Sequence, residues 1–543
     1  MDEGCLNHGE KRLKSRLAQN HYSGGDMRKF TGFVHAGMVL TIALALSPIA
    51  ATAASTELQP STLLAGAGND REDGGTAASV DSQAVVAVGA SVSDNSTLHA
   101  STETGQNPPG VLSVSVQPPI SEPPGQRKGP VSKIGDALEA RGITLGLILA
   151  NSYYTNPTTG ISSGHSVDYF ALFMSADVDL RKLVGIPNTH LHITEAWEPP
   201  THNTYAYAFQ AGSAFTPFPV QTTTTDLVKF TLSHDFFENR LHIEYGRMNL
   251  ADDFMVSTMC TGCLASTPAI TLNVPGFAKS VWGARIAYQL SHHTRLGLGV
   301  IEDDPALFTS SDGWDWRTRT RTGLLGVANM LYTTDFSDVP YPLNVEAGFY
   351  HSTSPYTDDL HNVDGSSQAL NPLATALTHG SGTWGFYGQA RQVIWSETGS
   401  VGPVPPNLAL YGGAFITPGA GQSYPVEAFG GAEYGGFLRD NPAALIGSTV
   451  RYIRLSRGRA LYEQQLSTIN GWGSSGVNQN TLAFDVHAQY GLAPGILING
   501  FAQYFLHPNR THTLAATGPS HSGLMVGVNV VIDIGRLSGL TKP

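Results

Sequence analysis

We predict an all-β fold for this chain: a transmembrane antiparallel β-barrel of about sixteen strands, preceded by a disordered N-terminal linker. The first observation is composition, since 14% of the 543 residues are charged, 9% are aromatic and 60 are Gly. The second is a mean hydropathy of -0.08, with no apolar run of about eighteen residues, which excludes a bundle of membrane-spanning helices. The third is a series of short segments in which apolar and polar residues alternate, as in half-buried strands.

The net charge of -12 argues against a nucleic-acid partner, because binding a phosphate backbone requires clustered Lys and Arg.

Residues 1–54 are expected to be an N-terminal extension followed by a signal peptide. Arg28 and Lys29 precede a weakly apolar stretch over 33–46, and Ala51-Thr52-Ala53 offers an Ala-x-Ala cleavage site. This three-part order is typical of a secretory signal. The alternative is a single membrane anchor, but the apolar stretch is shorter than the roughly 20 residues that span a bilayer. We therefore expect export from a bacterial cytoplasm.

Residues 55–132 are expected to form a linker rich in Pro, Ser and Ala. Few large apolar residues accompany motifs such as Gln117-Pro118-Pro119, so the segment lacks the apolar surface needed to offset the entropy of ordering. Ile134, Ala137 and Leu138 then follow at helical spacing, and Gly142 is a stop signal. We predict a short helix over 133–141 that opens a barrel domain at 133–543.

The barrel strands are predicted from alternation. In 482–492 one face is apolar and the other carries Asp485, His487 and Gln489. In 227–234, Val228 shares its face with Phe230 and Leu232, opposite a polar face. Segments 281–290 and 343–349 behave similarly, and about seventeen such runs are found in all. Because bacterial single-chain barrels have even strand numbers, we expect about sixteen strands, with eighteen as the alternative.

A soluble two-sheet sandwich is the competing fold. Its polar face would meet bulk water and usually carries many Lys and Glu, whereas the polar faces here carry mainly Gln, Asn, Thr and Gly. Aromatic residues also gather near predicted strand ends, as in the two interfacial belts of a membrane barrel; they include Tyr153, Tyr154, Trp197, Trp282, Trp314, Trp316, Trp395, Tyr504 and Phe505.

Other chemistry receives little support. Cys260 and Cys263 are candidates for a small loop disulfide, with free thiols or a functional pair as the alternatives. His190 and His192 share a predicted strand face, and His292-His293 form a second pair, but no carboxylate partner is identifiable for a metal site. Residues 160–164 match Gly-x-Ser-x-Gly without the strand–elbow–helix context of a hydrolase. We predict no enzyme activity, no cofactor and no metal.

Several segments in order resemble the carbohydrate-selective porin family, the OprB-type outer-membrane channels of Gram-negative bacteria. The likeness covers about 138–534 and is carried by Leu138–Ile143, Ala176–Leu183, Tyr245–Phe254, Phe386–Gln389, Gln489–Pro494 and Gln503–Pro508. The resemblance implies a sixteen-stranded outer-membrane pore for passive diffusion of glucose and related sugars. Two features depart from the family: the chain continues past Ile534 to Pro543, and a long Pro-rich segment precedes the barrel.

A sugar channel needs polar side chains that replace water around the solute hydroxyls. The residues expected on the wet face, and hence as channel lining, are Lys229, Glu244, Arg285, Gln289, Glu346, Gln389, Arg391, Asp485, His487 and Gln489. The alternative for each is an interstrand bond that stabilises the wall. Arg247 falls on the lipid face by parity, so we expect it at a rim or after a bulge. Loops over 251–279, 303–320 and 354–383 are expected to fold inward and narrow the pore.

The predicted partners are monosaccharides or small oligosaccharides and outer-membrane lipid, with a homo-oligomer as a possibility left open. The competing functions are a periplasmic or secreted all-β carbohydrate-binding protein and an outer-membrane barrel enzyme. The first would be extracted without detergent, and the second would need a Ser and a His that converge on one strand pair.

Overall fold

The fold is taken from a computed structural model that describes residues 129–198, 211–213, 225–248, 254, 280–303, 313–314, 316, 323–380, 382–397, 404–418, 422–472, 477–510 and 518–542. The predicted signal peptide, almost all of the predicted linker and both Cys260 and Cys263 lie outside these residues.

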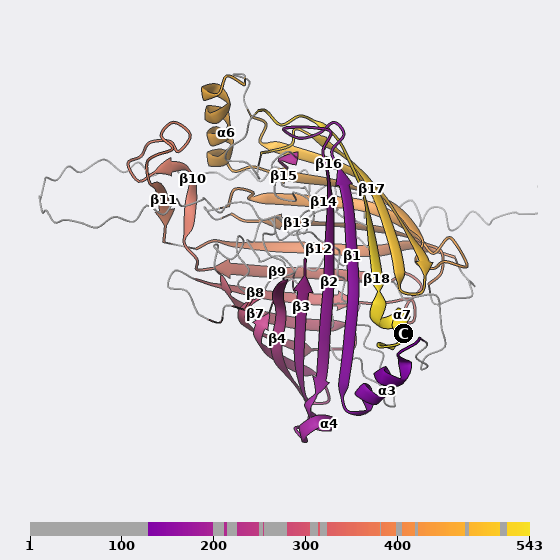
Figure 1. Ribbon diagram of the computed structural model, residues 1–543. Coiled ribbons are helices and arrows are strands. Elements are labelled where there is room, and N and C mark those ends of the chain that lie inside the picture. Colours follow the sequence, from indigo (N-terminus) through magenta and orange to yellow (C-terminus); the bar gives the residue numbers. More distant parts are fainter. Residues whose placement is uncertain are drawn as a thin grey trace, which may run out of the picture. The chain divides into compact units, whose positions relative to one another are not determined.

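Sixteen strands of the described chain form one closed antiparallel barrel, which confirms the predicted fold class and strand number (Figure 1). In chain order they are β1 (Ile143–Thr155), β2 (Ser166–Asp179), β3 (Thr189–Trp197), β4 (Thr225–Phe236), β5 (Leu241–Met248), β6 (Val281–Gln289), β7 (Thr294–Asp303), β8 (Gly323–Thr333), β9 (Leu343–Ser352), β12 (Trp384–Ser396), β13 (Asn407–Ile416), β14 (Val426–Gly435), β15 (Leu445–Arg454), β16 (Asn480–Ala493), β17 (Ile496–Leu506) and β18 (Gly523–Asp533).

The barrel closes where β1 pairs with β18. The register runs from Ile148 opposite Asp533 to Thr155 opposite Val526, while the other edge of β1 pairs with β2 along its whole length. Every other barrel strand pairs with its neighbour in the chain, except that β9 pairs with β12. Closure leaves no open sheet edge, which is the condition for a β-structure to span lipid.

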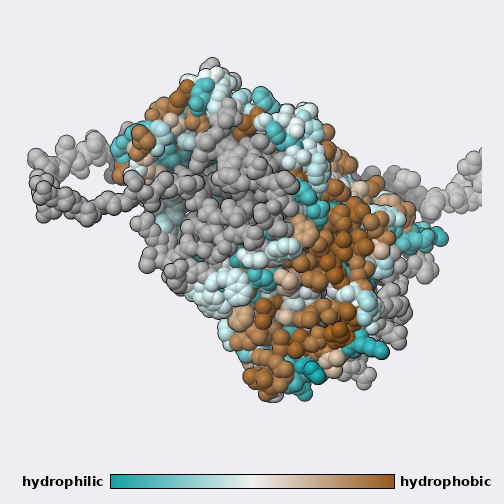
Figure 2. All heavy atoms as spheres, viewed as in Figure 1, coloured by the Kyte–Doolittle hydropathy of each residue, from teal (hydrophilic) through white to brown (hydrophobic). Residues whose placement is uncertain are grey.

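Alternation of side chains separates an apolar outside from a polar inside. On β16 the side chains of Phe484, Val486 and Tyr490 are exposed, with Val486 at 64%, whereas Asp485 and His487 are each 2% exposed. Hydrophobic residues gather in broad patches on the visible outer wall, with paler and hydrophilic residues between them (Figure 2). A wall of this kind places apolar groups against lipid and polar groups toward the lumen.

Aromatic side chains lie on the outer face near both ends of the strands. Tyr153, Trp197 and Tyr504 are exposed close to one end, and Trp395 and Tyr490 close to the other. Amphipathic rings at two levels match the two interfaces of a bilayer. Two rings that we grouped with them differ, since Tyr154 and Phe505 are fully buried in a cluster on the inner wall.

Short helices lie before the first strand, between β2 and β3, and after the last strand. Helix α3 (Ser132–Ala140) corresponds to the helix predicted over 133–141, α4 (Leu180–Val184) lies between β2 and β3, and α7 (Ile534–Ser538) follows β18. These three lie at the end of the barrel with the short turns, which is the periplasmic end in outer-membrane barrels, and opposite α6 (Arg457–Ile469) (Figure 1). No helix in the described residues is long and apolar enough to cross a membrane.

The segment after β18 joins α3 to the barrel. The amide of Val131 donates to the carbonyl of Ser538 at 3.0 Å, and the hydroxyl of Thr541 donates to the carbonyl of Leu145 at 2.7 Å. Lys542 pairs with Glu139 of the helix. The segment that follows Ile534 therefore links the two ends of the described chain.

Candidate functional site: the inner wall of the barrel

Most of the residues predicted to line the channel alternate along their strands with apolar residues on the outer face. Eight are almost completely buried: Lys229, Glu244, Arg285, Glu346, Gln389, Asp485, His487 and Gln489. Arg391 is slightly exposed. Gln289 lies at the periplasmic end of β6, where its amide donates to the carbonyls of Ser291 and His292. The structure groups most of the others into three clusters, each built around one glutamate.

The Glu244 cluster joins β4, β5 and β6. The guanidinium of Arg285 contacts the Glu244 carboxylate at 2.6 Å, and the ammonium of Lys229 lies 3.6 Å from its other oxygen. Thr231 donates a hydroxyl to the same carboxylate, and the His242 ring lies 3.7 Å away. Glu244 is 0% exposed, and a buried carboxylate is tolerated only when such partners replace its water.

The Glu346 cluster joins β8, β9 and β12 through neutral donors. Asn329 and the Tyr387 hydroxyl donate to Oε1 of Glu346 at 2.9 and 2.8 Å. The amide of Gln389 donates to Oε2 at 2.7 Å. Gln389 and Glu346 face each other directly across the β9–β12 pair, so their proximity follows from strand register.

The Glu433 cluster joins β12, β14 and β16. Arg391 pairs with one oxygen of the Glu433 carboxylate, and Nε2 of His487 lies 3.4 Å from the other. Nδ1 of His487 lies 2.6 Å from Asp485 on the same strand. Gln489 lies farther along β16 and donates to the carbonyl of Ala443 at 3.1 Å. Acids and bases are interleaved here, as in the Glu244 cluster.

Sequence reasoning missed the carboxylate partner of His190 and His192. Nδ1 of His190 lies 3.1 Å from Oδ1 of Asp177, and Nδ1 of His192 lies 2.6 Å from Oδ2. Asp177 and His192 face each other across the β2–β3 pair, so the partner is visible only once the register is known. The histidine pair is thus held by one carboxylate on the inner wall.

The seam between β1 and β18 carries uncharged polar groups that were also not predicted. Ser152 donates its hydroxyl to the side-chain carbonyl of Asn529 at 2.9 Å. Asn499 faces Asn529 from β17. The three glutamate clusters therefore lie on β4 to β16 and the Asp177 contacts on β2 and β3, whereas Ser152, Asn499 and Asn529 supply neutral groups at the seam.

Arg247 lies near the end of β5, as expected for a residue on the outer face. It stands in register with Trp282 and Phe230, and its guanidinium lies 5.7 Å from the centroid of the Trp282 ring. The guanidinium donates to the carbonyl of Ser280 at 2.7 Å. The Trp282 ring and the hydrogen bond to Ser280 explain how a cation is accommodated on this face at 2% exposure.

One described residue of the loop predicted over 251–279 reaches the inner wall. Phe254 is 2% exposed within a cluster of inward-facing apolar residues, and its ring lies 3.1 Å from the position that a Cβ on Gly297 would take. Gly297 of β7 pairs in register with Asn329 of β8, and both face the inside of the barrel. Oδ1 of Asn329 lies still closer to that position, so the absence of a side chain at Gly297 makes room for Asn329 as well as for Phe254. Apart from Asp303, Gly313, Trp314 and Trp316, the loop predicted over 303–320 lies outside the described residues.

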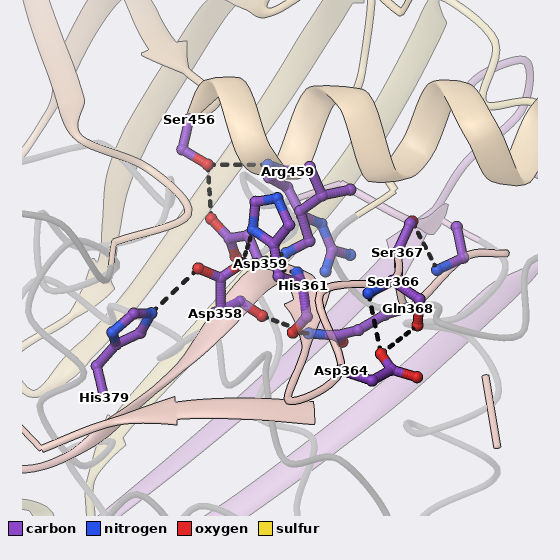
Figure 3. A network of polar contacts seen from close by, with 12 residues as sticks. Asp358, Asp359, His361, Asp364, Ser366, Ser367, Gln368, His379, Ser456 and Arg459 are labelled. Carbon is purple, nitrogen blue, oxygen red and sulfur yellow. Dashed lines mark hydrogen bonds and ion pairs between the residues drawn. The ribbon is translucent and has the colours of Figure 1, made fainter. Parts of the chain in front are cut away.

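The loop predicted over 354–383 forms a small sheet of its own. Strands β10 (Tyr356–Asn362) and β11 (Ala376–His379) pair with each other and lie at the same end of the barrel as α6 (Figure 1). Leu360 and Ala369 pack against Tyr462 and Leu466 of the helix. Asp359 accepts the hydroxyl of Ser456, the N-cap residue of α6. We call β10, β11 and α6 the rim module (Figure 3).

The Gly-x-Ser-x-Gly segment lies in the exposed turn between β1 and β2. Ser162 Oγ lies 3.0 Å from Nε2 of His165, and His165 donates its backbone amide to Asn156. No helix follows the serine, because β2 begins at Ser166. The strand–elbow–helix geometry of a hydrolase nucleophile is not what the chain builds here.

Comparison with known proteins agrees with this architecture. Residues 167–533 match the family model described as carbohydrate-selective porin, OprB family. The chain is similar to "Porin B" of Pseudomonas aeruginosa, with 23% identity over 217 residues; the match covers 38% of this chain and 47% of that protein, about half its length.

Among solved structures, the high-pH structure of Pseudomonas putida OprB has the same fold. It superposes with a TM-score of 0.61 at 16% identity and covers 73% of this chain and 95% of that one. The low-pH structure of the same protein is similar over the same share of this chain, with 13% identity and a TM-score of 0.44.

The sixteen-stranded barrel, its lipid-compatible outer face and its polar inner wall are the features of an outer-membrane channel. With the family match spanning 167–533, the chain belongs to the carbohydrate-selective porin family, OprB, of the bacterial outer membrane.

Proposed function

We propose that this porin allows glucose and related sugars to cross the outer membrane by passive diffusion through the barrel lumen, with the ten predicted lining residues setting the polarity of the path. The observation that carries the proposal is the polar inner wall of a closed barrel. Such a wall supplies donors and acceptors that can replace water around sugar hydroxyls.

The distribution of charge on this wall favours a neutral solute over an ion. Glu244 is paired with Arg285 and Lys229, and Glu433 with Arg391. Wall segments in which opposite charges are paired create a weaker net field than a ring of one sign. The free energy of an uncharged sugar changes little when it enters such a field.

Weak binding is also supported, because the carboxylates already have partners. Glu346 accepts three hydrogen bonds from neighbouring side chains. A passing hydroxyl must compete with these donors, so no single sugar is held tightly. A channel conducts only when its solute can leave as well as enter.

Liposome swelling tests the proposal directly. Proteoliposomes with the folded porin are expected to swell faster in glucose than in sucrose or amino acids of similar osmolarity. Swelling no faster than that of empty liposomes, from a preparation that shows heat-modifiable migration, would reject diffusion through this barrel.

Glu346→Gln tests whether the inner wall governs flux. The change keeps the size of the side chain and removes its charge, and we expect a several-fold change in glucose flux. Asp168→Asn is the matched control, since Asp168 is exposed and bonds Asn151 on β1; its flux should equal that of the unmodified porin. Equal flux in both variants would remove Glu346 from the path.

The sequence left open whether the porin forms a homo-oligomer. Chemical crosslinking of the porin in detergent, read against the heat-modifiable monomer band, decides between a single barrel and a homo-oligomer.

A further inference from the structure

We propose that His292, His293 and Asp338 form a periplasmic binding site for a divalent transition-series cation, Zn²⁺ above all. The three side chains come from two turns, β6–β7 and β8–β9, and their potential ligand atoms all lie within 4.8 Å of one another. Sequence reasoning left the histidine pair without a carboxylate, and the fold supplies Asp338 from a turn some 45 residues later.

The spacing between His292 and Asp338 suits two ligands of one ion. Nε2 of His292 lies 3.7 Å from Oδ1 of Asp338, which is too long for a hydrogen bond. Two donors that each lie about 2.0–2.1 Å from a tetrahedral zinc ion are about 3.3 Å apart. The ring of His292 is 55% exposed and has no hydrogen bond to the described residues, so a small rotation completes the approach.

His293 turns Nδ1 toward the carboxylate, with Nδ1 3.6 Å from Oδ2 of Asp338. Its Nδ1 lies 3.2 Å from the carbonyl oxygen of Thr333. A carbonyl can only accept, so Nδ1 carries the proton and the lone pair of the neutral ring is on Nε2. Nδ1 is also the nitrogen that faces Asp338, so an ion shared with this carboxylate displaces the proton from Nδ1, and the neutral ring then carries its proton on Nε2. The backbone is fixed as well, since the Thr333 amide donates to the His293 carbonyl at 2.9 Å.

Asp338 is held in place by its own turn. The amide of Asp335 donates to Oδ2 of Asp338 at 3.2 Å, and the amide of Val339 donates back to the carbonyl of Asp335 at 3.0 Å. On the other side, Gln289 steadies the histidine turn through the His292 carbonyl. Hydrogen bonds therefore hold both of the turns that carry the ligands.

The donor set decides the class of cation. Two imidazole nitrogens and one carboxylate oxygen suit Zn²⁺ and related ions, whereas Mg²⁺ and Ca²⁺ prefer oxygen donors throughout. Three protein ligands leave the fourth position of a tetrahedral site to water. The bound ion would tie the two turns together and stabilise the folded barrel, because an ion that binds only the native state shifts the unfolding equilibrium.

Isothermal titration of ZnCl₂ into the chelator-treated, detergent-folded porin tests the site. Cys5, Cys260 and Cys263 are first replaced by Ser, so that thiols do not bind zinc. We expect one strong site per chain, affinity at least tenfold weaker in His292→Ala and in Asp338→Asn, and no competition from Mg²⁺. Zinc should also raise the temperature at which the folded band is lost in the parent but not in the two variants.

His361→Ala is the matched control. His361 is exposed and lies 3.0 Å from Asp358, but it belongs to the opposite rim, where His379 contacts the same carboxylate. This variant should bind zinc as the parent does. Absence of binding by the parent, or equal affinity in the parent, His292→Ala and Asp338→Asn proteins, would overturn the proposal. Since all variants are assayed for heat-modifiable folding, loss of the fold is recognised separately.

Discussion

At the scale of single residues, the inner wall shows that similar carboxylates are stabilised in different ways. Glu244 depends on the positive charges of Arg285 and Lys229, whereas Glu346 is held by the neutral donors of Asn329, Tyr387 and Gln389. Removal of the negative charge should therefore have different consequences at the two positions.

Glu244→Gln is expected to destabilise the barrel by about 3–5 kcal/mol, because two buried cations lose the carboxylate that they share. Glu346→Gln should cost only about 1–3 kcal/mol, the price of one mismatched hydrogen bond. Urea unfolding of the two variants in lipid vesicles measures the difference. In Glu244→Gln/Arg285→Met the removal of one cation should restore part of the loss; equal stability of both single variants would contradict this account.

For the polar residues of the inner wall, the sequence predicts which face of a strand they occupy but not which side chains they contact. Alternation placed His487 opposite Val486, and the two side chains do lie on opposite faces of β16. It could not predict that His487 meets Glu433 on β14 or that His190 meets Asp177 on β2. These contacts depend on register between strands, which is set by long-range packing.

At the scale of elements, the rim module joins loops that lie far apart in the sequence. Asp358 illustrates its electrostatics, since it contacts the rings of His361 and His379. Burial acts to raise its pKa, but hydrogen bonds from the backbone amides of His361 and Leu360 and from the two rings outweigh burial and lower the pKa below its usual value.

A carboxyl whose pKa is lowered by folding stabilises the folded module fully above its unfolded pKa of about 3.9. This contribution is lost as the pH falls through the lower folded value. Amide hydrogen exchange of residues 356–379 should therefore accelerate, after correction for intrinsic rates, when the pH falls from about 5 to 3. Asp358→Asn should remove most of that pH dependence, and a dependence unchanged in this variant would assign it to another group.

The elements that sequence reasoning missed share a physical cause. The segment over 354–383 was predicted as a loop that folds inward, yet it contains the paired strands β10 and β11, and its residues Leu360 and Ala369 pack against α6 about a hundred residues later. Val228 was expected on the outer face with Phe230. It instead packs against Tyr169 and Ala196 of the inner wall, because the register between β3 and β4 shifts at this point. The sequence around such a bulge still reads as ordinary alternation, so the pattern alone did not predict the change of face.

At the scale of the whole molecule, alternation, turn residues and parity of strand number were enough to predict a barrel of sixteen strands. The charge clusters, the rim module and the link between Thr541 and Leu145 were not predicted, because each joins residues whose proximity exists only in the closed barrel. Alternation along each strand thus predicts the strands of the barrel, whereas contacts between distant strands depend on how the barrel closes.

A disulfide across the closing seam tests closure. Ser152 and Asn529 face each other on β1 and β18, so Ser152→Cys/Asn529→Cys in a background without other cysteines should oxidise in the folded porin. Constraining so long a loop could raise stability by up to about 5–6 kcal/mol. The oxidised variant should keep compact migration at temperatures that unfold its reduced form; identical migration of both forms would contradict the seam geometry.

The same seam constrains how the molecule is made. Its hydrogen bond between Ser152 and Asn529 joins positions 377 residues apart, and β1 has no second neighbour until β18 has been synthesised. The edge of β1 that pairs with β18 therefore stays without its barrel partner until β18 has been synthesised and the barrel closes. Contacts of such long sequence separation form slowly and leave intermediates prone to aggregation, so the nascent porin depends on whatever shields that edge until its final strand arrives.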